Sequence, residues 1–280
     1  MNRFIQAPIS SKLRTAVPTQ SVIGFPIASA SFEKQIDVII EWARASLSRV
    51  VCVSNVHMLM EGHWSPDFAE VLKSADLLTP DGMPLVWMTG LMKGKPQDRV
   101  AGMDLMLGLC RRAQAERISI FLLGSTDDVL TKMRERLALE FPRLEVVGAI
   151  SPPFRQLSEA EEHSIILKIN RSGAGLVFVC FGCPKQERWM SKHRGRIKTV
   201  MVGLGGAFAI YAGINQWAPP WVRKYGLEWC HRLVQEPRRL WKRYASTIPP
   251  FIWLAFKQVV KVQLGIDPDR SFRQSQFKDG

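Results

Sequence analysis

Short apolar segments alternate with longer helix-like segments from about residue 20 to residue 212, and this alternation constrains the fold more than any other feature of the chain. The apolar segments are rich in Val, Ile and Phe, which is typical of parallel strands covered on both faces. The pattern predicts an α/β fold, a Rossmann-like, mostly parallel sheet with helices on both faces. We expect strands at 49–54, 118–123, 145–149, 176–181 and 199–204, and helices at 32–47, 66–74, 103–116, 127–140, 159–171 and 185–193.

Two of the expected helices carry start signals. Ser125 stands three residues before Asp128, and Ser158 stands three residues before Glu161. This is the spacing of a capping box, in which the first side chain accepts a hydrogen bond from the third helical residue. The sequence therefore predicts helix caps at Ser125 and Ser158.

The composition changes after residue 214. Residues 215–265 contain nine Lys or Arg and only two acidic residues, which gives +7 of the formal charge of +13, and five of the nine Trp. Such a mixture is typical of a helical surface at a membrane interface; the alternative is an appendage that packs its aromatic residues on the main domain. We expect a disordered segment at 1–20, a catalytic domain at 21–214, a basic helical appendage at 215–265 and a disordered tail at 266–280. The appendage helices are expected to break at Pro219-Pro220, Pro237 and Pro249-Pro250.

Other features exclude several classes of protein. The five cysteines are odd in number, which argues against a disulfide framework and favours a reducing cytosol. Residues 1–20 have no apolar core of a secretory signal, and no run of 18 apolar residues predicts a transmembrane helix. No RNP-like or helix-turn-helix signal accompanies the basic charge, so we expect no nucleic-acid partner.

A carboxylate stands on a sharp turn in the segment Thr79-Pro80-Asp81-Gly82-Met83-Pro84. The segment follows an apolar run and precedes a helix-like run, so Asp81 is expected at the carboxyl edge of the sheet, where ligands bind in α/β folds. Pro80 and Gly82 fix the turn, and a rigid carboxylate in a cleft suits a general base. The alternative is that Asp81 only caps the next helix.

Four further turns follow predicted strands and should face the same edge. Asn55 follows the first strand and is either a substrate contact or structural. Ser125 at a helix N-terminus is either a phosphate ligand or a cap. The remaining polar or glycine positions either contact a ligand or serve as solvated surface and tight turns: Gly124, Lys185, Gln186, Glu187, Gly203, Gly205 and Gly206. No Walker A, HExxH, GxSxG or zinc spacing appears, and the one DxD pattern lies in the tail at 267–269, so we expect no required metal and no cofactor.

Six ordered blocks together resemble the WecG/TagA/CpsF family of glycosyltransferases, over roughly residues 45–245. They are residues 79–84 (TPDGMP), 98–104 (DRVAGMD), 121–125 (FLLGS), 181–190 (FGCPKQERWM), 202–208 (VGLGGAF), and 226–229 (GLEW) continuing to 236–240 (EPRRL). The resemblance implies an inverting transfer of a sugar from a UDP-sugar to a saccharide on a polyprenyl diphosphate, in the synthesis of cell-surface polysaccharides.

The resemblance also implies site roles. Asp81 becomes the general base on the acceptor hydroxyl. Asn55 and Gln186 look like polar contacts to substrate. Without a metal, the departing UDP must be stabilised by arginines, backbone N–H groups or a helix N-terminus. The candidates for the phosphates are Arg99, Arg232, Arg238, Arg239 and Arg243, and those for the nucleotide are Gly124, Ser125, Lys185, Glu187, Gly203, Gly205 and Gly206.

One position departs from the family. Val53 stands where members often have Thr, two residues before Asn55, so a hydroxyl contact is lost or moved. The donor stays open among UDP-N-acetylmannosamine, UDP-N-acetylmannosaminuronic acid and UDP-glucose, and the motifs are closer to exopolysaccharide members. The sequence predicts a peripheral enzyme at the cytoplasmic face of the inner membrane, docked through its appendage. A homo-oligomer and a non-catalytic nucleotide-binding partner of an assembly complex are left open.

Overall fold

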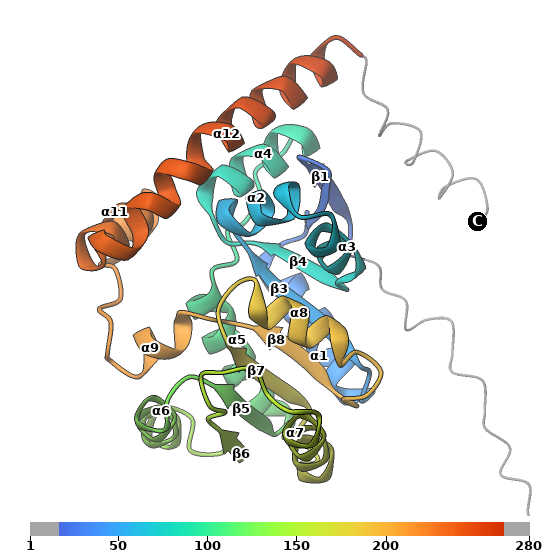
Figure 1. Cartoon of the computed structure of the whole chain (residues 1–280), viewed down its shortest axis with the longest axis vertical. Coiled ribbons are helices and arrows are strands. Elements are labelled where there is room, and N and C mark those ends of the chain that lie inside the picture. Colours follow the sequence, from blue (N-terminus) through green and yellow to red (C-terminus); the bar gives the residue numbers. More distant parts are fainter. Residues whose placement is uncertain (1–16, 266–280) are drawn as a thin grey trace, which may run out of the picture.

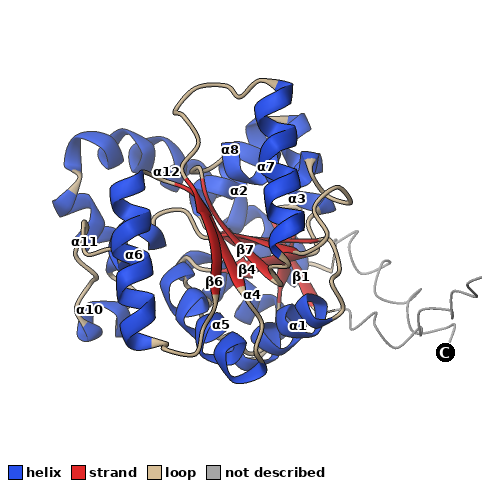
Figure 2. Cartoon of the chain, turned by 90° about the horizontal axis from the view of Figure 1, so that it is seen from below, coloured by secondary structure: helices blue, strands red, loops and turns tan. Residues whose placement is uncertain are grey.

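A computed structural model of the chain describes residues 17–265, and it has a six-stranded parallel sheet between two layers of helices (Figures 1 and 2). The strand order is β4-β3-β8-β7-β5-β6, and every pairing is parallel. The predicted α/β fold is confirmed. The strands are β3 (Arg49–Ser54), β4 (Leu77–Pro80), β5 (Ile120–Gly124), β6 (Val146–Ile150), β7 (Leu176–Cys180) and β8 (Val200–Gly203).

Alternating side chains of the strands feed two hydrophobic cores. In β3, Val51 and Val53 enter the core shared with α1, α5, α6 and α9, whereas Val50 and Cys52 enter the core shared with α2, α3, α4, α7 and α8. A strand that is buried on both faces therefore reads as a continuous apolar run. The helices are α1 (Phe32–Arg44), α2 (Val56–Trp64), α3 (Pro66–Ser74), α4 (Met83–Lys93), α5 (Gly102–Glu116), α6 (Asp127–Glu140), α7 (Glu159–Ser172), α8 (Lys185–Lys192) and α9 (Ala207–Tyr211).

An antiparallel hairpin of β1 (Thr19–Val22) and β2 (Phe25–Ala28) precedes α1 and was not expected from the sequence. Its turn residues Ile23 and Gly24 both have positive φ, which is the tight hairpin geometry that a β-branched residue such as Ile23 rarely adopts. The expected disordered segment is therefore too long at its C-terminal end. Residues 1–16 of that segment and the tail 266–280 lie outside the described residues.

One of the two predicted caps is confirmed and the other is wrong. Ser158 and Glu161 form a capping box at the start of α7. At α6 the cap is Thr126, whose hydroxyl accepts from the Val129 N–H, and not Ser125. Ser125 has a φ of 63°, which is outside the extended region that a helix cap adopts. Its N–H instead donates to the Cys180 carbonyl at 3.0 Å, which ties the end of β5 to the end of β7.

The basic appendage (residues 215–265) forms α10 (Pro220–Lys224), α11 (Glu228–Gln235) and α12 (Pro237–Gln263). Prolines stand at the starts of α10 and α12, as expected, but the break predicted at Pro249-Pro250 is wrong because α12 runs through it. The carbonyls that lose their partners there belong to the exposed residues Ala245 and Ser246, so water can satisfy them.

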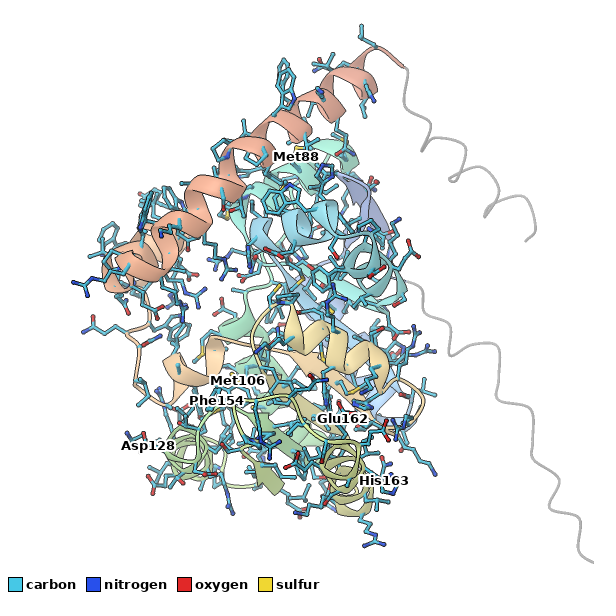
Figure 3. The ribbon with its side chains drawn as sticks, in the orientation of Figure 1. Met88, Met106, Asp128, Phe154, Glu162 and His163 are labelled. Carbon is cyan, nitrogen blue, oxygen red and sulfur yellow. The ribbon has the colours of Figure 1, made fainter. Side chains whose placement is uncertain are left out.

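Packing also keeps α12 in one piece. Phe251 and Ala255 are buried in the same core as Met88 of α4 (Figure 3), and α12 packs directly against α2. The Gln258 side chain accepts from the Ile23 N–H at 2.8 Å and donates to the Ser21 carbonyl at 2.7 Å, so the helix is also tied to the hairpin. Within residues 17–265, no helix has the length and apolar character needed to cross a membrane.

Candidate active site

The parallel sheet brings the ends of all its strands to one edge. The turns after β3, β4, β5, β7 and β8 carry, in that order, Asn55, Asp81, Ser125, Gln186 and Gly205. From β5 the chain continues to β6 on one side, and from β7 it continues to β8 on the other side, so the strand order reverses between β5 and β7. Ligands bind at such a reversal in open α/β sheets.

The glycine at this reversal is required by close packing. A Cβ on Gly124 would lie 2.2 Å from the Cys180 carbonyl oxygen, and its φ is 107°. Gly124 and Ser125 therefore form a compact turn beside β7, where a ligand can approach the backbone. This is consistent with the expected nucleotide position, which stays a prediction.

Asp81 is held by backbone contacts at the end of β4. Its N–H donates to the Ser54 carbonyl at 2.9 Å, and the neighbouring Pro80 carbonyl accepts from the Val100 N–H at 2.8 Å. The N-terminal cap of α4 is Gly82, and no side chain caps that helix. The alternative interpretation of Asp81 as a cap is therefore wrong, and its carboxylate is available for chemistry.

Arg99 lies between two carboxylates. Its Nε donates to the Asp81 backbone carbonyl at 2.7 Å, and its Nη2 lies 3.4 Å from Asp81 Oδ1 and donates to Glu228 of the appendage. The three side chains are only 17–22% exposed. Burial raises the pKa of Asp81, while the cations Arg99 and Arg232 oppose that rise and Glu228 adds to it. Arg99 is thus beside the candidate base, rather than free in a phosphate site.

Asn55 stands next to Asp81 at the neighbouring strand end. Its Oδ1 accepts from the Met58 N–H at 3.1 Å and caps α2, which leaves the Nδ2 donors to a substrate. Its Cβ is close to Gly82, where an added Cβ would lie 3.7 Å away. Nearby, burial and the Arg243 charge lower the pKa of His57 to about 4, so His57 is neutral at neutral pH.

Gln186 and Glu187 form a buried pair at the start of α8. Gln186 Nε2 donates to Glu187 Oε1 at 2.6 Å, while Gln186 Oε1 and Glu187 Oε2 find no hydrogen-bond partner in the described chain. Burial raises the pKa of Glu187. Because Glu187 has no exposed surface, the direct nucleotide contact expected of it does not fit; it contacts Gln186 instead. Lys185 is exposed at the first position of the helix.

The glycines after β8 make room for side chains. A Cβ on Gly203 would lie 3.1 Å from Gln186 Nε2, and one on Gly206 would lie 2.5 Å from Arg232 Nη2. Gly205 has a φ of 49° and turns the chain between them. The loop at residues 203–206, called the platform below, therefore contacts Gln186 on one side and Arg232 of the appendage on the other.

One of the four expected appendage arginines reaches this platform, and a second lies elsewhere at the same edge of the sheet. Arg232 lies on Gly206 and is near enough to Asp81 to affect its pKa. Arg243 is half-buried near His57 and Cys183, and burial lowers its pKa. Arg239 is 71% exposed and paired with Glu236 at 2.7 Å, and Arg238 is exposed, so a role for these two in binding stays a prediction.

Sequence reasoning missed the acidic member of the appendage. Glu228 lies in the matched segment 226–229, yet its pairing with Arg99 spans 129 positions and has no local signal. Gly226 is the one sequence signal for this contact. A Cβ added to Gly226 would lie 2.2 Å from Met83 Cγ, and the φ of Gly226 is 70°. A glycine inside a helical, aromatic segment can thus mark the place where the segment packs closely on the domain.

Taken together, the edge combines one carboxylate with an available oxygen, amide donors and two arginines without carboxylate partners among residues 17–265. Such a set can accept a proton and stabilise a departing anion. In the same part of the chain, no cluster of three or more His, Cys, Asp or Glu has an arrangement that could hold a metal ion.

Comparison with known proteins shows the family and several relatives. The model of the glycosyl transferase WecG/TagA/CpsF family matches residues 20–264. A Bacillus subtilis strain 168 protein named N-acetylglucosaminyldiphosphoundecaprenol N-acetyl-beta-D-mannosaminyltransferase is 28% identical over 243 residues, which cover 86% of this chain and 92% of that protein.

Two further relatives carry the same name. The Bacillus spizizenii protein is 33% identical over 209 residues, with 74% of this chain and 78% of that protein covered. The Staphylococcus aureus strain MW2 protein is 27% identical over 199 residues, with 70% and 75% covered.

Proposed function

Because the chain belongs to the WecG/TagA/CpsF family and is a glycosyltransferase, we propose that it transfers a sugar from a UDP-sugar to a saccharide carried on a polyprenyl diphosphate, in the synthesis of a cell-surface polysaccharide. The relatives' names make UDP-N-acetylmannosamine and N-acetylglucosaminyl diphosphoundecaprenol the first donor and acceptor to test. The observation that carries the proposal is the Asp81 carboxylate, fixed by backbone contacts at the sheet edge and faced by Arg99 and Arg232.

In the proposed reaction, Asp81 accepts the proton of the acceptor hydroxyl. The acceptor oxygen bonds to the anomeric carbon as the bond from that carbon to UDP breaks, so the configuration inverts and UDP leaves with the bonding electron pair. Relatives are named as β-mannosaminyltransferases, which fits inversion of an α-linked UDP-sugar. A buried carboxylate with a raised pKa is a stronger base than an exposed one, provided that it is ionised.

The charge of the departing UDP is balanced by arginines in this proposal. Arg232 and Arg243 have no carboxylate partner within residues 17–265. Arg232 lies on the platform formed by Gly203, Gly205 and Gly206, and Arg243 lies near His57 and Cys183 at the same edge of the sheet. Guanidinium groups bind diphosphates in two-pronged fashion. The reaction therefore requires neither a divalent metal nor a cofactor.

The appendage supplies a surface for the membrane that holds the acceptor. Aromatic and aliphatic side chains are exposed along α10, α11 and α12, interspersed with exposed Lys and Arg: Trp221, Trp229, Trp241, Ile252, Trp253 and Phe256. Amphipathic basic helices with exposed Trp bind anionic interfaces. We propose peripheral binding at the cytoplasmic face of the inner membrane, where UDP-sugars are made.

The test is UDP release from a panel of UDP-sugars, with N-acetylglucosaminyl diphosphoundecaprenol as acceptor and EDTA present. We expect acceptor-dependent release from one donor and a β-linked product by NMR. Release that stops with EDTA and returns with Mg²⁺ would overturn metal independence. UDP binding without release from any donor, over a range of acceptors, would favour a non-catalytic partner of an assembly complex.

A further inference from the structure

Besides the packing of α12, the appendage meets the rest of the molecule at a seam made by α10 and α11 on one side and α4, α5 and the loop between them on the other. Two ion pairs cross this seam: Arg223 of α10 to Asp104 of α5, at 3.5 Å, and Glu228 of α11 to Arg99. Gly226 lies between them against Met83, close enough that a side chain there would clash. The two ion pairs of the seam share no residue, so each can be removed by a substitution that leaves the partners of the other in place.

The hydrogen bonds of Arg99 show which partner holds it. Nε is fixed on the Asp81 backbone carbonyl at 2.7 Å. Nη2 makes its closer contact with Glu228 and stays 3.4 Å from Asp81 Oδ1, at the outer limit of a hydrogen bond. Glu228 thus takes the strong charge-assisted hydrogen bond, and the Asp81 carboxylate is only loosely contacted.

We propose that Glu228 is a positioning residue, which holds the Arg99 guanidinium beside Asp81 and prevents it from closing onto the carboxylate. The inference rests on the proposed function, since it takes Asp81 as the base. It assigns the appendage an acidic contribution to the site, in addition to its arginines. Docking of the appendage then controls how strong a base Asp81 is, in addition to the binding of the departing anion.

Electrostatics predicts the direction in which loss of Glu228 changes the base strength of Asp81. Without the Glu228 charge, the nearest anionic acceptor for Arg99 Nη2 is Asp81 Oδ1, and a direct ion pair would stabilise the ionised carboxylate and weaken it as a base. Loss of the negative charge of Glu228 near Asp81 acts in the same direction. The other charged or titratable groups that face Asp81 are Arg232 and Tyr244 of the appendage, and the substitution leaves both in place.

The experiment compares kcat against pH for the full-length wild type, Glu228→Gln and Asp104→Asn, with saturating donor and acceptor. For Glu228→Gln we expect a plateau kcat about tenfold lower, an acid limb about one pH unit lower, and a donor KM within about twofold of wild type. Asp104→Asn breaks the other ion pair of the seam, so it should keep the wild-type acid limb. Hydrogen exchange of residues 220–235 reports whether the appendage stays docked in each variant.

Two results would overturn the inference: a wild-type profile in Glu228→Gln, or the same loss and shift in Asp104→Asn, which would make Glu228 a docking contact alone. If exchange shows that Glu228→Gln undocks the appendage, Glu228→Asp decides, because it keeps the charge and shortens the reach; a lower acid limb supports the inference and an unshifted one refutes it. The variant Asp81→Asn distinguishes failure of the proposed function from failure of the positioning role of Glu228. Turnover retained in Asp81→Asn refutes the proposed base itself, whereas an inactive Asp81→Asn beside an unaffected Glu228→Gln refutes only the positioning.

Discussion

Ion pairs hold about half of the charged residues of the sheet domain (residues 21–214), whereas seven of the nine Lys and Arg of the appendage form no ion pair within residues 17–265. Asp76 at the N-terminal end of β4, for example, binds both Arg49 and Arg194, at 2.8 and 2.6 Å. In the appendage, Arg232 and Arg243 have no ion pair to any residue from 17 to 265. A half-buried cation without a partner costs free energy, and burial accordingly lowers the pKa of Arg243.

This difference separates folding from function. Paired charges in the sheet domain satisfy one another and need no ligand. Under the proposed function, the open charges at the edge of the site bind an anion that arrives later, the diphosphate of the nucleotide or of the lipid. The following predictions, from the largest expected effect to the smallest, test whether the division holds.

Asp81→Asn should produce the largest effect, because it removes the proposed base and keeps the shape of the side chain. We expect turnover to fall about 10³-fold, within the range for loss of general-base catalysis. UDP affinity, measured by calorimetry, should stay equal or become tighter, since a negative charge near Arg232 is lost. Asp37→Asn, which changes an ion-paired carboxylate on α1, is the matched control and should keep full turnover. Comparable turnover in the two variants would contradict the assignment.

Arg243→Met should separate activity from stability. We expect kcat/KM to fall about 100-fold, since a charge contact to the substrate phosphates is lost. The melting temperature should stay unchanged or rise, because a half-buried cation without a carboxylate partner is removed. Lys242→Met, at an exposed position of the same helix, should change neither quantity. A lower melting temperature with normal activity would show that Arg243 serves the fold, and the comparison between the two regions would fail.

The sheet and the core of the site could be predicted because their signals are local. Short continuous apolar runs give the strands, and the turn chemistry around Asp81 and the segment with Gln186 gives the positions of these two residues at one edge. The errors have tertiary causes. Ser125 is drawn into a left-handed turn by its bond to Cys180, and α12 survives two prolines because Phe251 and Ala255 anchor it.

The same reasoning explains why Glu187 and Glu228 were misjudged or missed. Glu187 lies in a polar run that begins at Lys185, yet α8 turns it into the core, where Gln186 is its partner. Glu228 obtains its role only when the appendage folds back on Arg99. Neither burial nor a contact across 129 positions is encoded in a short motif.

Membrane binding should depend on the open charges of α12. Lys257→Glu with Lys261→Glu should weaken binding to anionic vesicles by at least about 2 kcal/mol, or at least about 30-fold, since each lost basic residue near such a surface contributes about 1 kcal/mol and each new Glu is repelled. Lys168→Glu with Arg171→Glu is the matched control on α7, which lies at the opposite end of the molecule from α12 (Figure 1). Vesicle co-sedimentation measures both. Equal losses in the two double variants would mean that net charge, and not the appendage, drives binding.

The smallest expected effect concerns a histidine that the sheet domain keeps neutral. The side chain of His193 has no exposed surface, and burial lowers its pKa to about 4, with Arg196 and Lys192 adding to the shift and Glu162 opposing it. The unfolded chain titrates near pH 6.5, so between about pH 6.5 and 4 it binds a proton that the folded state does not. His193 therefore makes the free energy of unfolding fall as the pH falls through this window.

Replacement by a residue that does not titrate should remove this contribution. We expect His193→Gln to reduce the loss of unfolding free energy between pH 6.5 and 4 by at least about 1 kcal/mol, measured by urea denaturation at several pH values. Asp81 and Glu187, whose pKa values are raised, act in the opposite direction, but they are common to both proteins and cancel in the difference. His163→Gln, at an exposed position of α7 (Figure 3), is the control and should keep the wild-type slope. If the unfolding free energy of His193→Gln has the same pH dependence as that of the wild type, His193 is protonated in the folded state. It would then be a charged group paired with Glu162, and not a neutral buried side chain.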